Sequence, residues 1–215
     1  MRGNIAIFIA HPYCSFDCAN GMIKALENGY KFKIFGQDTV EDDFFDDVDI
    51  VAVPGGIGDA NAYERLMGAN QSRIQEFVAQ GGGYLGICMG AYWAAKHYLD
   101  ILDCVNATQY ITRPDTCTRR PHPKGMPVTW DGASEHMYFY DGPAFHGNRR
   151  AKYDVVATYP NGDAMAIYQG RVGLIGCHPE STAHWYRQTA YMKRHWHRGR
   201  HHKLLRKFVD GLMER

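Results

Sequence analysis

The stretch that decides the fold is residues 83–92, Gly-Tyr-Leu-Gly-Ile-Cys-Met-Gly-Ala-Tyr. An apolar run that breaks at Gly-x-Cys-x-Gly predicts a buried strand, a sharp turn and then a helix. Such a turn exposes one side chain at the carboxyl end of the strand, and here that side chain is the thiol of Cys88. The pattern is a nucleophile-elbow arrangement with cysteine in place of serine.

Cys88 has two interpretations. Free cysteines are often buried and inert. Against this, Cys88 opens a predicted helix, whose N-terminal dipole lowers the pKa of a thiol. Ninety residues later, His178 ends an apolar run and can supply a base, and Glu180 can fix the tautomer of that base. Cys177 is expected to point away from His178 and to pack in the core. We therefore predict that Cys88, His178 and Glu180 are catalytic.

A second turn supports this prediction. Pro54-Gly55-Gly56 follows the predicted strand Val48–Val53, and ligands of parallel sheets gather beyond the carboxyl ends of the strands. A backbone N–H of Gly55 or Gly56, together with that of Met89, would then form an oxyanion hole. The alternative is that Pro-Gly-Gly is only a turn.

Apolar runs and helical spacing alternate through residue 98, which predicts an α/β fold with a parallel sheet. The expected strands are Asn4–Ala10, Lys31–Phe35, Val48–Val53 and Tyr84–Ile87, and the expected helices are Cys18–Asn28, Asn70–Gln80 and Gly90–Tyr98.

The second half of the chain changes character. Residues 104–135 predict long loops or an irregular insertion, and Leu204–Met213 a closing helix. Short strands separated by turn signals predict antiparallel additions at His136–Tyr140, Tyr153–Thr158, Asp163–Tyr168 and Arg171–Gly176. With no interdomain linker, one domain over residues 1–215 is the simplest organisation.

Composition bounds the class of protein. The chain has 215 residues, of which 45% are hydrophobic, and a net charge of +1, so no global charge points to nucleic acid. It has no run of about 20 apolar residues and no signal-peptide pattern, which predicts a cytoplasmic location without membrane contact. Its six cysteines then read as free thiols. Cys14 and Cys18 have poor zinc spacing, and we expect no metal.

The charge is uneven along the chain. Residues 37–49 are acidic and residues 187–207 are rich in Arg, Lys and His. We favour solvated surface for both segments, and for the histidines 195, 197, 201 and 202 over metal binding. The alternative is that the aromatic and basic segment Trp185–Lys207 stacks on a nucleic acid and contacts its phosphates.

Three strings carry a family resemblance. At Pro54-Gly55-Gly56, Gly86–Gly90 and His178-Pro179-Glu180, in this order and spacing, the chain resembles class I glutamine amidotransferases. The resemblance implies a flavodoxin-like three-layer sandwich with a mostly parallel central sheet. It also implies a Cys88–His178–Glu180 triad and a thioester formed from an amide substrate.

A closer resemblance is to the amidotransferase-like domain at the N-terminus of eukaryotic biotin–protein ligases. Residues 81–95, the aromatic segment Met137–Gly142 and the ending His178-Pro179-Glu180 carry it. It does not imply biotin transfer, because the ligase domain has no counterpart in the 215 residues.

The chain departs from the glutaminase pattern at Tyr92. Glutaminases of this class carry Gln there, where it helps to hold the substrate glutamine. Tyr92 either lines a pocket of different shape or packs in the helix. We expect Tyr138, Tyr140 and Asp141 to shape the same pocket.

These features predict a cysteine-dependent amidohydrolase or amidotransferase that needs no cofactor of its own and acts on a small-molecule amide, such as glutamine or a γ-glutamyl compound. Ammonia or an acyl group would pass to a synthetase or acceptor-protein partner, because the chain lacks a Gly-x-x-x-x-Gly-Lys-Ser/Thr string. Two alternatives stay open: a γ-glutamyl hydrolase, and a non-catalytic binding or regulatory module that keeps the elbow without using it.

Overall fold

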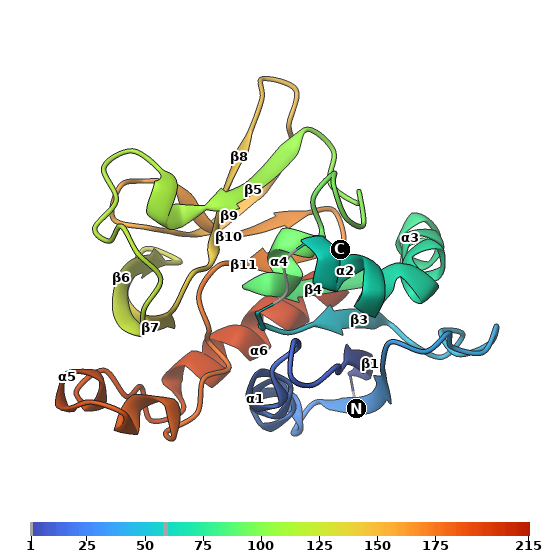
Figure 1. Ribbon diagram of the computed structural model, residues 1–215, viewed down its shortest axis with the longest axis horizontal. Coiled ribbons are helices and arrows are strands. Elements are labelled where there is room, and N and C mark those ends of the chain that lie inside the picture. The colour runs from blue at the N-terminus through green and yellow to red at the C-terminus, as the bar shows by residue number, and fades with distance from the viewer. Residues whose placement is uncertain (1, 58–59) are drawn as a thin grey trace.

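A computed structural model describes residues 2–57 and 60–215, and a parallel sheet lies at the centre of the described chain (Figure 1). Its neighbouring strands are parallel throughout, in the order β2-β1-β3-β4-β11. The strands are β1 (Gly3–Phe8), β2 (Tyr30–Phe35), β3 (Ile50–Val53), β4 (Gly83–Ile87) and β11 (Val172–Ile175).

Helices cover both faces of this sheet, as Figure 1 shows. Alternate side chains of each strand enter different core clusters: Ile5 and Ile7 pack with residues of α1 (Phe16–Leu26) and α6 (Arg200–Met213). Ala6 and Phe8 belong to the cluster on the other face, with α2 (Ala60–Met67), α3 (Gln71–Ala79) and α4 (Met89–Trp93). The period-2 alternation of a strand buried on both faces explains this division, and the predicted three-layer α/β sandwich is confirmed.

The sheet continues beyond β11 with antiparallel strands, so the predicted C-terminal additions are confirmed there. The exception is β11 itself: the strand expected at Arg171–Gly176 pairs parallel with β4 and antiparallel only with β10. The order runs on as β10-β9-β6-β7, and β8 pairs with both β10 and β5. These strands are β5 (Val105–Gln109), β6 (Lys124–Trp130), β7 (Ala133–Phe139), β8 (Pro143–Gly147), β9 (Asp154–Thr158) and β10 (Ala164–Gln169).

The prediction of long loops over residues 104–135 is wrong for β5 and β6. Proline and glycine obscured the alternation of β6, which still buries Met126, Val128 and Trp130. Pro127 pairs in register with His136 of β7, whereas β6 meets β9 only at Thr129 and Trp130. A strand tolerates proline where one of its edges is unpaired.

The helix after the elbow is shorter than predicted, because α4 ends at Trp93 instead of Tyr98. Beyond it, the amides of Ala95 and Tyr98 reach carbonyls only three residues back, and the Leu99 amide bonds to the Trp93 carbonyl. No element was predicted for α2, and α6 begins four residues before the expected Leu204. The remaining short elements are η1 (Gly68–Asn70), η2 (Tyr110–Thr112), η3 (Trp185–Arg187) and α5 (Ala190–Lys193).

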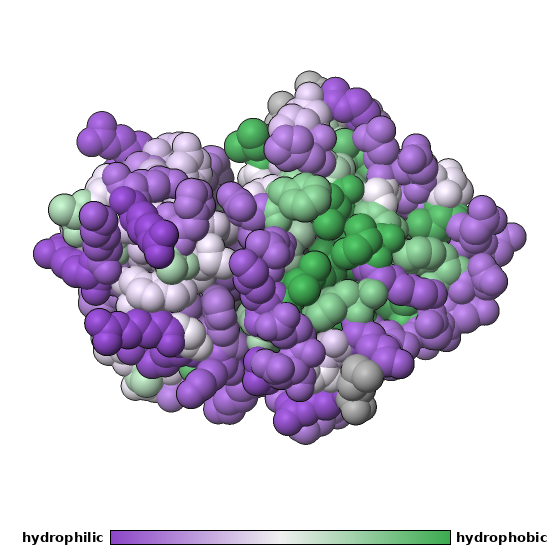
Figure 2. All heavy atoms as spheres, turned by 90° about the horizontal axis from the view of Figure 1, so that it is seen from below, coloured by the Kyte–Doolittle hydropathy of each residue, from purple (hydrophilic) through white to green (hydrophobic). Residues whose placement is uncertain are grey.

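The surface is divided into an apolar and a polar part. Figure 2 shows apolar side chains gathered under α1 and β2, whereas the part under α5 is mostly hydrophilic. Phe16 of α1 and Ile34 of β2 are exposed, and Ile23 and Phe32 are partly buried against the core. β2 is the outermost strand of the sheet order. No helix in the described residues has the length and apolar character that crossing a membrane requires.

The prediction that the histidines of the basic segment are solvated is wrong for His197 and His201. His197 and His201 are only 4% and 0% exposed. His197 Nε2 lies 2.9 Å from the carbonyl oxygen of Ser181, and His202 Nε2 lies 3.0 Å from the same atom. His201 Nε2 lies 3.1 Å from Glu135 Oε2, and the guanidinium of Arg200 donates to the same carboxylate. These histidines tie α6 and the segment before it to the loop after β11 and to β7.

The aromatic residues of the basic segment are also mostly buried. Trp185 and Tyr186 are 7% and 1% exposed, and both pack edge-on against Tyr138. Trp196 is partly buried against the same cluster. Among the tryptophans and tyrosines of this segment, Tyr191 alone is exposed, and its ring packs against His195 and the guanidinium of Arg194. Rings that are used in such packing are not available to stack on bases, so the structure gives no support to the nucleic-acid interpretation.

Protonation of the buried histidines is expected to destabilise the fold. Burial lowers the pKa of His197 to about 3 and that of His201 to about 4. Between these values and about 6.5, the unfolded chain binds more protons than the folded one, so stability falls as the pH falls. Each of these two histidines lowers the free energy of unfolding by at most about 1.4 kcal/mol per pH unit.

His178 has the opposite effect, because its pKa is raised in the folded protein. The stabilisation that it contributes is complete below about pH 6.5 and is lost as the pH rises through the folded pKa.

We expect the thermal midpoint of unfolding, measured by circular dichroism, to fall between pH 6.5 and 5, and to fall less steeply in His197→Gln/His201→Gln. His97→Gln is the matched control, because His97 is exposed. Equal slopes in the wild type and the double variant would contradict this account.

Candidate active site

Cys88 lies in the sharp turn between β4 and α4, where the sequence predicts it. Its backbone has φ 51° and ψ −105°, a strained region for a residue with a Cβ. A Cβ on Gly86 would lie 2.5 Å from the carbonyl oxygen of Gly90, and one on Gly90 would overlap the carbonyl of Val53. The two glycines therefore let the turn close tightly against the strands. Because α4 is a single short turn, its dipole is smaller than that of the predicted helix.

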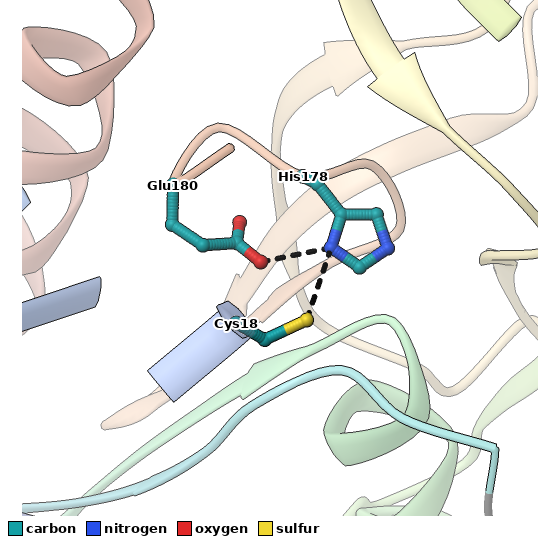
Figure 3. A group of neighbouring side chains, drawn as sticks. All are labelled: Cys18, His178 and Glu180. Carbon is teal, nitrogen blue, oxygen red and sulfur yellow. Dashed lines mark hydrogen bonds and ion pairs between the residues drawn. The ribbon is translucent and has the colours of Figure 1, made fainter. Parts of the chain in front are cut away.

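His178 follows the end of β11 and is held from two sides. Its backbone N–H donates to the carbonyl of Tyr138, 2.8 Å away, and its Nδ1 lies 2.8 Å from Glu180 Oε1 (Figure 3). Glu180 is fully buried, and its Oε2 has no hydrogen-bond partner among the described residues. The carboxylate fixes the imidazole with Nδ1 toward Glu180, which leaves Nε2 as the nitrogen that can accept a proton.

The charge of Glu180 dominates the environment of His178. Burial works against a charged imidazole, but the Glu180 carboxylate and the Cys88 thiolate outweigh it and raise the pKa of His178 well above its usual range. The imidazole of His178 therefore holds a proton more strongly than a free histidine does.

Cys18 also contacts His178, and the sequence analysis did not identify it as a site residue. Its Sγ lies 4.0 Å from His178 Nδ1, on the same side of the ring as Glu180 (Figure 3). Burial raises the pKa of the Cys18 thiol, although the hydrogen bond to His178 opposes this. Its place in the chain could have identified Cys18 as a site residue. It follows shortly after β1, and the carboxyl ends of β1, β3 and β4 lie at the same edge of the sheet.

Cys18, His178 and Glu180 form a group that can in principle hold a metal ion. One sulfur, one nitrogen and one oxygen lie within 4.8 Å of one another, and all three side chains are buried. Thiolate, imidazole and carboxylate are donors that suit zinc. Cys14 is outside this group, because its thiol donates to the carbonyl of Phe8 in the core. In the structure, Nδ1 is already engaged by Glu180.

A cleft of about 900 Å³ opens in front of Cys88 and His178. It brings together most of the residues predicted from the sequence: Gly56, Cys88, Met89, Tyr92, Tyr138, Tyr140, Asp141 and His178 line it. Gly55 lies just behind the wall, since a Cβ there would come within 2.6 Å of His178 Cε1. Glu180 lies behind His178, so its carboxylate reaches the cleft only through the imidazole.

The loop after β3 is fixed by backbone hydrogen bonds to the segment after β1. The Ser15 amide donates to the Gly55 carbonyl at 2.9 Å, and the Ile57 amide to the Tyr13 carbonyl at 2.8 Å. A Cβ on Gly56 would overlap the Tyr13 carbonyl oxygen. This close approach of two backbones explains the glycine and places Gly56 at the wall of the cleft.

Tyr92 spans the cleft wall between the two halves of the chain. Its hydroxyl donates to the backbone carbonyl of Asp141, 3.2 Å away. The side chain of Asp141 accepts from Gln109 Nε2 at 2.9 Å through Oδ2. Gln109 also lines the cleft but was not predicted, because its strand β5 lies in the segment expected to be loop.

Comparisons with known proteins identify what the chain is similar to. Residues 12–99 match the family described as "Biotin-protein ligase, N terminal". The chain is 28% identical over 166 residues to a biotin–protein ligase of Schizosaccharomyces pombe, covering 62% of this chain and 26% of that protein. The chain thus spans about a quarter of the length of this curated relative.

Two solved structures have the same fold over nearly their whole length. One is a glutamine amidotransferase from Thermotoga maritima, with a TM-score of 0.68, 12% identity and 100% of both chains covered. The other is a glutamine amidotransferase from Methylobacillus flagellatus, with a TM-score of 0.64, 14% identity, and 100% of this chain and 93% of that chain covered. The resemblance predicted from the sequence is confirmed: the chain has the class I glutamine amidotransferase-like fold, and residues 12–99 match the N-terminal domain of biotin–protein ligases.

Proposed function

We propose that the protein is a cysteine-dependent amidohydrolase or amidotransferase, with Cys88 as nucleophile, His178 as base and Glu180 as the residue that orients the base. The observation that carries the proposal is the meeting of two separate strings in one cleft. The elbow after β4 presents Cys88, and the loop after β11 presents His178 with a buried carboxylate at 2.8 Å. Nucleophile, base and orienting group are the parts that acyl transfer requires.

The reaction proceeds in two halves. The Cys88 sulfur attacks the amide carbonyl, and its proton passes to His178. When the C–N bond breaks, His178 gives this proton to the leaving amine, and the acyl group stays on Cys88 as a thioester. Water, or an acceptor amine, then attacks the thioester; its proton passes through His178 back to sulfur, and the acyl group leaves as an acid or a new amide.

Backbone N–H groups stabilise the oxyanion in both halves. Gly56 and Met89 line the same cleft as Cys88, and Gly55 lies directly behind the wall. Donors fixed in advance cost no reorganisation during the reaction, and each contributes about 3 kcal/mol to the transition state. The hydrogen bonds that hold the Gly55–Ile57 loop supply this rigidity.

The partner we infer is a ligase or an acceptor protein. The ligase relative combines a similar segment with a chain about four times as long. Joined to such a partner, the site would deliver ammonia or an acyl group to it. We do not propose free glutamine as the preferred substrate, because the Tyr92 side chain occupies the position of the glutaminase Gln and bonds across to Asp141.

The two thiols beside His178 allow a matched test of the nucleophile. Cys88→Ala should reduce amine release from a panel of primary amides, including glutamine and γ-glutamyl amides, by about a thousandfold or more. Cys18→Ala removes a thiol that contacts the same imidazole but lies on the Nδ1 side. This variant should reduce amine release about tenfold at most. Amine release is followed by a coupled ammonia assay and mass spectrometry.

A fully active Cys88→Ala protein would overturn the proposal. The proposal would also be overturned if Cys18→Ala abolished turnover and Cys88→Ala did not affect it. If the wild type releases no amine from any amide, with or without a ligase or acceptor partner present, the non-catalytic binding module replaces the enzyme as the conclusion.

The buried carboxylate provides a pH-dependent test. Glu180→Gln keeps the size of the side chain and a carbonyl oxygen for Nδ1 but removes the charge that favours an imidazolium. The Cys88 thiolate then loses its positive neighbour. The pH dependence of iodoacetamide alkylation at Cys88 should therefore shift to higher pH. For each pH unit of this shift, the alkylation rate at pH 7 should fall about tenfold.

The rates of the wild type and Glu180→Gln should converge at high pH, where the thiol is ionised in both. The measurement is the second-order rate constant at Cys88 between pH 5 and 10, by peptide-mapped mass spectrometry. Superimposable profiles would show that Glu180 does not act on the Cys88–His178 pair.

A further inference from the structure

The cleft in front of Cys88 has an unbalanced charge. Among the described residues that line it, two carry carboxylates, Asp17 and Asp141, and none is a lysine or an arginine. The other titratable groups on its wall are cysteines, tyrosines and the histidines 11, 178 and 184. The chain as a whole has 24 Lys and Arg against 23 Asp and Glu, so the lack of basic side chains is a local property of the cleft.

Asp141 is poorly satisfied by the protein itself. Its Oδ2 accepts one hydrogen bond from Gln109 Nε2, whereas Oδ1 is buried and has no partner among the described residues. Burial raises the pKa of this carboxyl, although the Gln109 bond opposes the shift. A partly buried carboxylate without a counter-charge is costly, and a cation in the cleft would offset this cost.

Aromatic rings form much of the remaining wall. Tyr92, Tyr138 and Trp185 line it together with the exposed rings of Phe16 and Tyr140, which are 60% and 45% exposed. Ring faces attract ammonium and guanidinium groups, and they also pack well against an apolar stem. The wall thus suits a ligand with an apolar stem and a positive end.

Any positive charge on His178 is already compensated by its two neighbours in the protein. Its Nδ1 is engaged by Glu180, and its other neighbour is Cys88. A carboxylate on the substrate would therefore share the cleft with Asp17 and Asp141 and would meet no lysine or arginine among the described lining residues. A free amino acid carries such a carboxylate, which counts against free glutamine for a reason independent of Tyr92.

We propose that the substrate of this site is an amide whose remote end carries a positive charge, and that Asp141 is the residue that selects it. The ligand class is an amide with an ammonium or guanidinium group on an apolar stem and without a free carboxylate. This inference rests on the proposed function, because it assumes that Cys88 is the reacting group.

Three chloroacetamides of equal length test the charge preference. They end in a trimethylammonium, a carboxylate or an uncharged methyl amide. In each case the Cys88 sulfur displaces chloride from the CH₂ carbon, a C–S bond replaces the C–Cl bond, and the thiol proton passes to His178. The rate of labelling at Cys88, extrapolated to low probe concentration, is measured by peptide-mapped mass spectrometry.

In the wild type, the cationic probe should label Cys88 about tenfold faster than the anionic one. In Asp141→Asn this ratio should fall severalfold, and the thermal midpoint of unfolding, measured by circular dichroism, checks that the variant is folded. Asp43→Asn is the matched control, because Asp43 is exposed and outside the cleft lining. Its ratio should equal that of the wild type.

The failures of the two proposals are distinguishable. If the uncharged probe does not label Cys88 selectively, the proposed function fails and this inference fails with it. If it does, but the wild type has no preference for the cation or Asp141→Asn retains the preference, the substrate class is wrong and the proposed function stands.

Discussion

The parallel pairing of β4 with β11 is the constraint on which the site depends. Ile87 pairs in register with Ile175, and the Cys88 amide donates to the Ile175 carbonyl at 2.9 Å. This register places the elbow one residue beyond the pair on one strand, and the loop to His178 three residues beyond it on the other. Two strings separated by ninety residues therefore meet at one edge of the sheet.

The second half of the chain supports His178 from behind. The amide of His178 bonds to Tyr138 of β7, and the Ser181 carbonyl lies within hydrogen-bond distance of Nε2 of both His197 and His202. Tyr186 reaches the hydroxyl of Ser181 at 2.9 Å. A buried carboxylate such as Glu180 keeps its orientation only if the backbone around it is fixed. The basic, aromatic segment thus serves the site from inside the protein and not from its surface.

The parts that sequence analysis predicted well are those set by local strings. The apolar strands, the glycines around Cys88 and the His-Pro-Glu ending each follow from a few neighbouring residues, and the structure brings Cys88 and His178 into one cleft with Glu180 behind it. Cys18 and Gln109 were missed because only tertiary packing brings them to the cleft. The buried histidines were misjudged because their partners, Ser181 and Glu135, are distant in sequence.

The central claim is that an acyl group from an amide resides on Cys88. The most direct measurement is acid quenching of the wild type during incubation with amides, including cationic ones, followed by peptide-mapped mass spectrometry. The account predicts a mass increase on the peptide of Cys88 equal to the acyl group less one hydrogen, in step with the first equivalent of released amine. Amine release without any acyl group on Cys88, or an acyl group on Cys18 instead, would contradict it.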